Sequence, residues 1–459
     1  MQKLMKSLLA LALLSMAACG PNNNNNGTPD GGDGNGGEGG DVSVTQPITE
    51  DTTWTADKVY HLKTNVFVKD GATLTIEPGT KITGEGTAAL VVTREGKLNA
   101  VGTAEKPIVF TSFKPEGERK PGDWGGVVML GKARINVKAG ETAHGVEIAQ
   151  DGETYIEGIN STASEGLYGG SDDTHDCGKL KYARIEFAGI KVSEDNELNG
   201  LSLGGCGSKT EIDYVQIHKG NDDGIEAFGG TANLKHIVIS QPDDDGLDFD
   251  LGYRGKVQFV VIQQNESVGN NGFEWDDNPN NKTATPQTLP TVYNVSIIGS
   301  GRDPGVMGTS QVIANFKNGA AGHIYNLAAA YVANLGVDVA GDEVVAHVND
   351  GDLFVKNSLF WSIGGSNTDF PADATDNDSG FDENQQIAKD ASNVWADPML
   401  DGAKNLADPN FKPAAGSPLL DGATAAQPPA DGFFDAEAKF IGAVGTTDWT
   451  AGWTAFPAN

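Results

Sequence analysis

A repeat of about two dozen residues runs through the middle of the chain. A glycine followed by an apolar–x–apolar triplet occurs four times, and Gly200, Gly224, Gly246 and Gly272 are 24, 22 and 26 residues apart. Between these triplets lie longer runs of alternating apolar and polar residues, such as LKYARIEF from Leu180. Alternation is the period of a β-strand, so each repeat supplies two or three short strands.

The length of the repeat selects one architecture. A β-propeller needs ~40 to 50 residues per blade, and a leucine-rich repeat needs a fixed Leu and Asn pattern that this chain lacks. Gly, Asn and Asp lie between the strands and favour turns. Glycine contributes 61 of the 459 residues, about twice the usual ~7%. The sequence therefore predicts an all-β solenoid, a parallel β-helix.

Both ends of the predicted solenoid carry motifs of a known kind of protein. Residues 66–112 contain EPGT and GTAEKPIVFTS, and residues 408–423 read DPNFKPAAGSPLLDGA. They resemble the opening and closing coils of uncharacterised bacterial surface lipoproteins of the right-handed parallel β-helix, pectin-lyase-like type. The resemblance covers residues 44–459. It implies a right-handed β-helix and carries no established activity with it.

The first 19 residues, MQKLMKSLLALALLSMAAC, are predicted to be a lipoprotein signal peptide. Two lysines precede an apolar run that is too short to span a membrane. The ending resembles a lipobox, although Met16 stands where leucine is usual, and it implies lipidation of Cys19. An ordinary cleaved signal is the alternative. Because no Asp follows the cysteine, the resemblance implies a lipid anchor in the outer membrane.

The remainder divides into a tether and one domain. Residues 20–42 are rich in Asn, Gly and Asp and predict a flexible tether, and residues 43–459 predict the β-helix domain. Residues 137–178 interrupt the coils and are expected to form a long loop across one face. Residues 424–459 are expected to form a C-terminal cap whose aromatic residues cover the last coil.

Two cysteines remain after Cys19. Cys177 and Cys206 are an even pair in an exported chain, which favours a disulfide. Free thiols and metal ligation are the alternatives, and metal ligation has no CxxC motif to support it.

The charge of the chain excludes several partners. Its formal net charge is -31, from 63 Asp and Glu against 32 Lys and Arg. Nucleic-acid binding needs clustered cations, so we expect no nucleic-acid partner. Electrostatic attachment to anionic lipid is excluded for the same reason. No HExxH motif is present, so zinc hydrolase chemistry is unsupported.

Part of this charge is expected to form a ladder on one outer face. In the triplet after Gly224, Ile225 and Ala227 point inward, so Glu226 points outward. Asp248 and Glu274 take the same place in the next two coils, ~4.8 Å apart. The turns before the glycines and the positions two residues further on add more carboxylates. The predicted ligand-binding residues are Asp222, Asp223, Glu226, Asp248, Asp250, Glu274 and Asp276.

Carboxylates this close either recruit a cation or raise one another's pKa. Oxygen ligands on flexible turns suit Ca²⁺, so Ca²⁺ is the expected cofactor if one binds. A solvated acidic face, with Asp and Asn chosen for their turns, is the alternative. The expected metal ligands are Asp223, Glu226, Asp245, Asp248 and Glu274.

A catalytic interpretation of residues 222–277 stays open. Pectate lyases and polygalacturonases share the β-helix and use clustered Asp with Arg or Lys, and Asp244, Asp245, Asp248 and Arg254 resemble such a set. Neither family's full motif set is present, and Arg254 has a simpler role as an ion-pair partner of Asp248 or Asp250.

The sequence therefore predicts a non-catalytic outer-membrane surface lipoprotein, a binding or spacer module. Its expected partners are a polysaccharide or a surface protein, bound with or without Ca²⁺. The alternative is a polysaccharide lyase or glycoside hydrolase that uses the acidic face.

Overall fold

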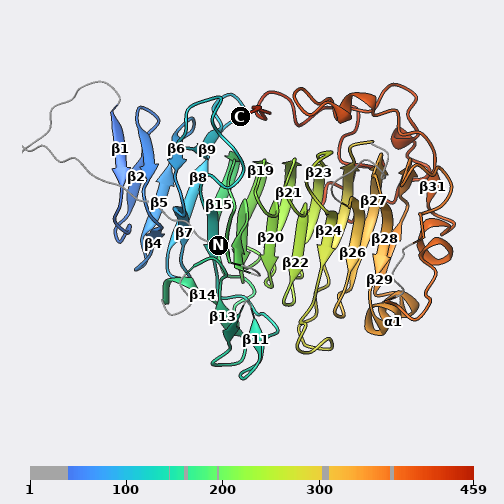
Figure 1. The fold of residues 1–459 in the computed structure, drawn as a ribbon, viewed down its shortest axis with the longest axis horizontal. Coiled ribbons are helices and arrows are strands. Elements are labelled where there is room, and N and C mark those ends of the chain that lie inside the picture. Colours follow the sequence, from blue (N-terminus) through green and yellow to red (C-terminus); the bar gives the residue numbers. More distant parts are fainter. Residues whose placement is uncertain (1–39, 144, 160–163, 194–195, 302–309, 373–376) are drawn as a thin grey trace, which may run out of the picture. The chain divides into compact units, whose positions relative to one another are not determined.

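Strands stacked in parallel dominate the part of the chain that the structure describes. The computed structural model describes residues 40–143, 145–159, 164–193, 196–301, 310–372 and 377–459. Across these residues the strands form three long ladders, and each coil in the middle of the solenoid contributes one rung to each ladder (Figure 1). The predicted parallel β-helix is confirmed. No helix in the described ranges is long and apolar enough to cross a membrane.

Ladders 1 and 2 are joined because six long strands bend, so that each pairs with neighbours in both ladders. These strands are β15 (Gly178–Glu186), β19 (Glu211–His218), β21 (Asn233–Ser240), β23 (Lys256–Gln263), β25 (Thr291–Ile298) and β27 (Gly322–Ala330). Their first halves complete ladder 1 with β2 (Thr52–Trp54), β5 (Thr73–Ile76), β8 (Lys97–Val101) and β29 (Leu353–Lys356). Their second halves complete ladder 2 with β1 (Asp41–Val44), β3 (Val59–Leu62), β6 (Lys81–Gly84), β9 (Ile108–Ser112), β30 (Leu359–Trp361) and β31 (Val394–Trp395).

Ladder 3 is a separate sheet of nine strands among the described residues. It contains β4 (Val66–Val68), β7 (Ala89–Val92), β10 (Gly126–Leu130), β18 (Leu201–Gly204), β20 (Ile225–Phe228), β22 (Leu247–Asp250), β24 (Asn271–Trp275), β26 (Val312–Phe316) and β28 (Leu335–Val339). The repeated glycine triplets of the sequence form the middle of this ladder.

The glycine of each repeated triplet is required by close packing at a corner. A Cβ atom on Gly224 would lie 2.5 Å from Cγ2 of Ile239, and one on Gly272 would lie 2.6 Å from Cδ1 of Ile297. Those isoleucines belong to ladder 2 and fill the core. The repeat therefore pairs a glycine in one ladder with a β-branched residue in the next.

At the bend between ladders 1 and 2, side chains of successive coils stack in a column. Tyr182, Tyr214, His236 and Phe259 all have a positive φ, which L-residues rarely adopt. Their rings stack between coils, with centroids 4.3, 4.1 and 5.0 Å apart. Stacking offsets the unfavourable backbone geometry.

Short elements lie outside the ladders. The insertion, defined as residues 137–178, contains β11 (Thr142–Ala143), β12 (Val146–Glu147), β13 (Glu153–Tyr155), η1 (Ser164–Gly166) and β14 (Leu167–Gly169). The hairpin after β15 contains β16 (Ile190–Ser193) and β17 (Asn196–Leu198). The C-terminal part contains α1 (Asp342–Asp350), η3 (Asn384–Ala388), η4 (Asp401–Lys404) and η5 (Pro418–Leu420).

The insertion is more than a loop. Its two hairpins bury Ile148, Ile156 and Tyr168 in an apolar cluster with Val128 and Leu130 of ladder 3. It returns to the coils at a disulfide between Cys177 and Cys206, whose Cα atoms are 5.9 Å apart.

The C-terminal segment corrects the expectation of a cap on the last coil. Residues 396–459 run back along the outer face of ladder 2 (Figure 1), and Gly117 N–H donates to the Asn459 carbonyl. Trp453 lies edge-on to Tyr214 at 5.9 Å, and Trp449 lies edge-on to His236 at 5.1 Å. The physical reason is that ladder 2 has apolar residues on its outer face, which need a cover. The end of the core is closed by Phe370 and Trp395, which pack on Phe360.

Candidate functional site

The carboxylate ladder lies in register on ladder 3. Glu226 pairs with Asp248, and Asp248 pairs with Glu274. Ser202 precedes this row and Asn315 follows it. These side chains alternate with buried apolar residues of the core and face outward, as the strand period requires.

The turns before the strands bind one coil to the next through their carboxylates. Asp223 Oδ1 accepts a hydrogen bond of 2.9 Å from the Asp245 N–H. Asp245 in turn accepts from the Asn271 N–H at 2.5 Å and from Asn271 Nδ2 at 3.1 Å. Asn271 Nδ2 also donates to Glu274 at 2.7 Å, and Asn199 Nδ2 donates to Glu226. Asn and Asp at these turns therefore order the acidic side chains.

Together these residues line a pocket of about 570 Å³ on the outer face of ladder 3. Within the described residues its lining includes eleven acidic side chains and two lysines. The acids are Glu157, Glu197, Asp222, Asp223, Glu226, Asp244, Asp245, Asp248, Asp250, Glu274 and Asp276, and the lysines are Lys191 and Lys317. Every ligand-binding residue predicted from the sequence is among them.

The carboxylates form three groups suited to a metal ion in the described part of the chain. In each group the ligand atoms lie within 4.8 Å of one another. The groups are Asp222, Asp223 and Asp244; Asp223, Glu226 and Asp248; and Asp245, Asp248 and Glu274. Asp223 and Asp248 each belong to two groups, so the three form one continuous cluster.

Burial and mutual repulsion disfavour the charged forms. Desolvation and then the charge of Asp223 raise the pKa of Asp222 to about 10. Desolvation and then the charge of Glu157 raise the pKa of Glu226 well above its ordinary value. Desolvation and then the charge of Asp223 do the same to the pKa of Asp248. The cluster therefore needs either protons or bound cations to balance its charge.

One buried oxygen atom of the pocket lining, and another close to the acidic cluster, lack a hydrogen-bond partner in the part of the chain that the structure describes. Asp248 Oδ1 makes no hydrogen bond within the described residues, and neither does the hydroxyl of the fully buried Tyr168. Asp250, Glu226 and Glu157 act electrostatically on that hydroxyl. Buried polar atoms without a protein partner indicate a bound ion or an ordered water molecule.

Four charged residues of the lining were not predicted from the sequence: both lysines, Glu157 and Glu197. Lys317 pairs with Glu274, and Lys191 pairs with Glu197 at 2.6 Å. Extending the repeat by one coil would have found Lys317, because Glu274 pairs with Asn315 two residues before it. Glu157 lies in the insertion, which is not part of the repeat, so the repeat could not predict its position.

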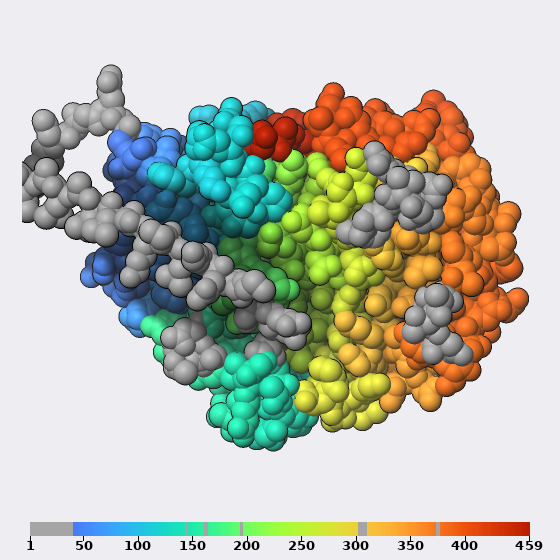
Figure 2. Space-filling model, viewed as in Figure 1, coloured from blue at the N-terminus to red at the C-terminus, as the bar shows by residue number. Residues whose placement is uncertain are grey.

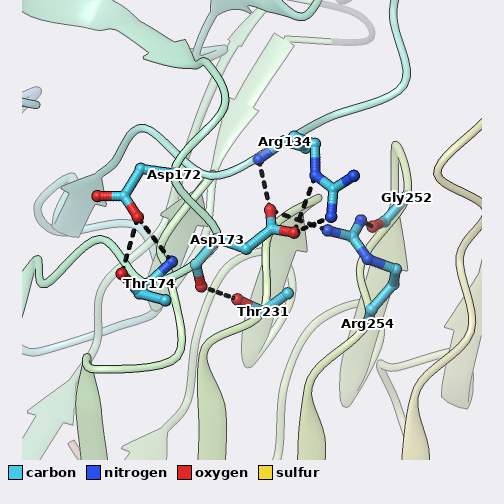
Figure 3. Close-up of polar contacts among 7 residues, drawn as sticks. All are labelled: Arg134, Asp172, Asp173, Thr174, Thr231, Gly252 and Arg254. Atoms are coloured by element: carbon cyan, nitrogen blue, oxygen red, sulfur yellow. Dashed lines mark hydrogen bonds and ion pairs between the residues drawn. The ribbon is translucent and has the colours of Figure 1, made fainter.

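Arg254 does not lie in the pocket, which corrects its expected pairing. Its guanidinium donates to Asp173 Oδ1 at 3.1 Å and to the Gly252 carbonyl at 2.6 Å (Figure 3). Arg134 binds the same carboxylate. The reason is that the insertion places Asp173 within ion-pair distance of the Arg254 guanidinium. The candidate catalytic set therefore keeps Asp244, Asp245 and Asp248 together and loses Arg254.

A comparison with protein families agrees with this architecture. A family model described as a pectate-lyase like beta helix domain matches residues 46–454. The chain belongs to this family. Comparison with curated proteins and with solved structures found no match. Membership establishes the fold and leaves the activity to be argued from the pocket.

Proposed function

We propose that the pocket on ladder 3 binds divalent cations, with Ca²⁺ preferred. The observation that carries this proposal is the shared carboxylate cluster, in which Asp223 and Asp248 each belong to two ligand groups. Every side chain in those groups offers carboxylate oxygen, which hard cations prefer. The groups hold no His or Cys, so zinc and copper are disfavoured. Ca²⁺ tolerates irregular geometry better than Mg²⁺ does.

The bound cation is proposed to assist in binding a hydrophilic ligand, a glycan first. A volume of about 570 Å³ lies within the usual size of a ligand site, ~300 to 1,000 Å³. Its lining of acids, lysines and asparagine suits hydroxyl groups better than an apolar ligand. Ca²⁺ takes six to eight ligands, so ligand hydroxyls can complete a shell begun by three carboxylates. A surface protein presenting carboxylate or carbonyl oxygen is the other partner class.

A binding role is favoured over a lyase because the proposed base is elsewhere. Arg254 is engaged with Asp173. Of the two lysines that line the pocket, Lys191 pairs with Glu197. Burial opposes the charge of the other, Lys317, but Glu274 raises its pKa above the ordinary value. A charged lysine donates protons and does not abstract them, so it does not replace the missing base.

The location is proposed from the signal peptide. Cys19 lies outside the described residues, and its lipidation would anchor the domain in the outer membrane by the tether. A Cys19→Ser variant is expected to move the protein from the membrane fraction to the soluble fraction. Unchanged fractionation would contradict the anchor.

Thermal unfolding with Ca²⁺ or with a chelator tests the cation site. At a Ca²⁺ concentration of 100 times Kd, the added stability is ~2.7 kcal/mol, which corresponds to a rise in Tm of roughly 3 °C for a domain of this size. A variant with Glu226, Asp248 and Glu274 all changed to Ala is expected to lose this rise. A matched variant with the exposed Glu105, Glu116 and Glu118 changed to Ala has the same charge change and is expected to keep it.

Equal Tm values for the wild type with Ca²⁺ and with chelator would overturn the cation site. The enzymatic alternative has its own assay, the release of unsaturated sugar from polyuronates or of reducing ends from neutral glycans. Product formed by the wild type and lost in Asp248→Asn would replace the binding role by catalysis.

A further inference from the structure

A second pocket, called here the basic pocket, lies at the corner where ladder 3 leads into ladder 1. Its volume is about 570 Å³, and its lining comes from the turns that precede β5, β8, β15 and β19, together with Lys132 after β10. Asp172, Thr174 and Asp176 in this lining belong to the end of the insertion, which projects from the stacked coils (Figure 2). Among the described residues, the basic pocket shares no lining residue with the acidic pocket on ladder 3.

The lining of the basic pocket is entirely polar. Within the described residues it contains only glycine, threonine, histidine and charged side chains, so it suits a hydrophilic ligand. Lys and Arg outnumber Asp and Glu by four to three in this lining, although Asp and Glu outnumber Lys and Arg by 63 to 32 in the whole chain. The cations are Arg94, Lys97, Lys132 and Lys209, and the acids are Glu95, Asp172 and Asp176. This local reversal of charge favours a ligand that carries negative charge.

Two of the lysines are held in place by the acids of the same pocket. Lys97 Nζ donates to Asp176 at 2.8 Å, and Lys132 pairs with Glu95 at 2.7 Å. An ammonium group has three N–H donors, and each of these ion pairs occupies one of them. Both lysines are therefore positioned by the protein and still have donors for a ligand.

Lys209 adds a third ammonium group from the turn before β19. Its side chain is exposed, and within the described ranges it forms no ion pair and no hydrogen bond. The acid on the same side of the insertion, Asp172, instead accepts from the Thr174 N–H at 3.0 Å and from the Thr174 hydroxyl at 2.8 Å (Figure 3). The charge of Lys209 is therefore available to a ligand.

Arg94 contributes charge without offering a fork to the ligand. Its guanidinium pairs with Glu153 at 3.0 Å and donates to the Gly169 carbonyl at 2.9 Å, both in the insertion. A ligand in the basic pocket consequently meets ammonium groups, which act as point charges and need no planar partner. Several such charges suit a phosphate or sulfate group better than a single planar carboxylate does.

We propose that the basic pocket binds a saccharide that carries a phosphate or sulfate ester. Lys97, Lys132 and Lys209 bind the ester group, and the carboxylates of the lining accept hydrogen bonds from the sugar hydroxyls. This arrangement gives both signs of charge in the lining a role. The site is independent of the proposed cation site, because its ligand brings negative charge and needs no Ca²⁺.

Calorimetric titration with glucose 6-phosphate, glucose 6-sulfate and glucose tests the proposal. Chelator is present throughout, so that no cation in the acidic pocket can bind the ester. The wild type is expected to bind at least one of the esters and to bind glucose more weakly. Lys209→Glu is expected to weaken binding of the ester roughly tenfold, because a charge-assisted contact is lost and repulsion is added.

The matched control is Lys106→Glu, which makes the same charge change at an exposed lysine outside the lining and is expected to keep the wild-type affinity. The variant with Glu226, Asp248 and Glu274 changed to Ala is also expected to keep it. Absence of binding of both esters to the wild type, or wild-type affinity in Lys209→Glu, would overturn this inference while the cation site stands. Inorganic phosphate that binds as tightly as glucose 6-phosphate would overturn the saccharide as the ligand.

Discussion

The outer faces of ladders 2 and 3 belong to the same coils, but the C-terminal segment covers the first and the second lines a pocket. On ladder 2 the outward residues Gln216, Val238, Val261 and Ser296 lie in one row, and all are buried under the C-terminal segment. On ladder 3 the outward row of Glu226, Asp248 and Glu274 lines an acidic pocket.

This difference follows from the side chains on each face, because a protein segment can cover neutral groups more readily than a row of carboxylates. On ladder 2 the C-terminal segment covers neutral side chains, and its backbone can form hydrogen bonds with the polar ones. Gln216, for example, donates to the Ala455 carbonyl and accepts from the Ala455 N–H. A row of carboxylates offers no such match, since burying like charges without cations is strongly unfavourable. The chain therefore covers one face with its own C-terminal segment, whereas the acidic face lines the pocket that we propose to bind a cation.

The largest expected effect comes from placing a charge on the covered face. Val261→Asp would bury an unpaired carboxylate between ladder 2 and the C-terminal segment, where Val261 is fully buried. We expect a loss of roughly 3 to 5 kcal/mol in the free energy of unfolding. Denaturant unfolding measures it.

The matched change on the other face is Asp248→Val, which removes a charge from the cluster. In chelator its free energy of unfolding is expected to equal or exceed that of the wild type, because repulsion is relieved. Equal losses in both variants would show that the two faces do not differ as described.

An intermediate effect on stability is expected when the pH is lowered, because His218 lies on the covered outer face of ladder 2. Burial lowers the pKa of His218 to about 4, although its hydrogen bond to the Pro457 carbonyl acts in the opposite direction. The unfolded chain takes up the proton near pH 6.5, so stability falls as the pH drops from about 6.5 to about 4. At ~1.4 kcal/mol per pH unit, the loss reaches roughly 3 kcal/mol.

The difference in stability between wild type and His218→Gln at each pH isolates this effect. Carboxylates with raised pKa values act in the opposite sense, since the folded state keeps its protons to higher pH and is stabilised as the pH falls. Their contribution cancels in the difference. A difference that is constant from pH 7 to pH 4 would contradict the assignment to His218.

The smallest effect is expected at Lys317, one of the two lysines that line the pocket. Lys317→Gln removes the positive charge paired with Glu274, so Ca²⁺ is expected to bind roughly fivefold more tightly, about 1 kcal/mol. Lys282→Gln makes the same charge change at an exposed pair with Glu343 and is expected to leave the affinity unchanged. Calorimetric titration measures both, and weaker binding in Lys317→Gln would count against a cation in the pocket.

The site residues that belong to the repeat were predictable from the sequence. The row of Glu226, Asp248 and Glu274 follows from strand alternation and coil spacing, because both are local rules applied three times. Arg254 was placed wrongly, since its partner Asp173 is 81 residues away in sequence and belongs to no repeat. Glu157 was missed for the same reason.

The sequence by itself determined the parallel β-helix, the order of its coils and the register of the carboxylates. These follow from short periods in the chain and from the fixed spacing of hydrogen-bonded strands. Only the tertiary structure decided which outer face the C-terminal segment covers, where Arg254 points and what closes the acidic pocket. Those outcomes depend on contacts between distant, non-repeating segments, where side-chain fit and charge balance select among partners that no local pattern distinguishes.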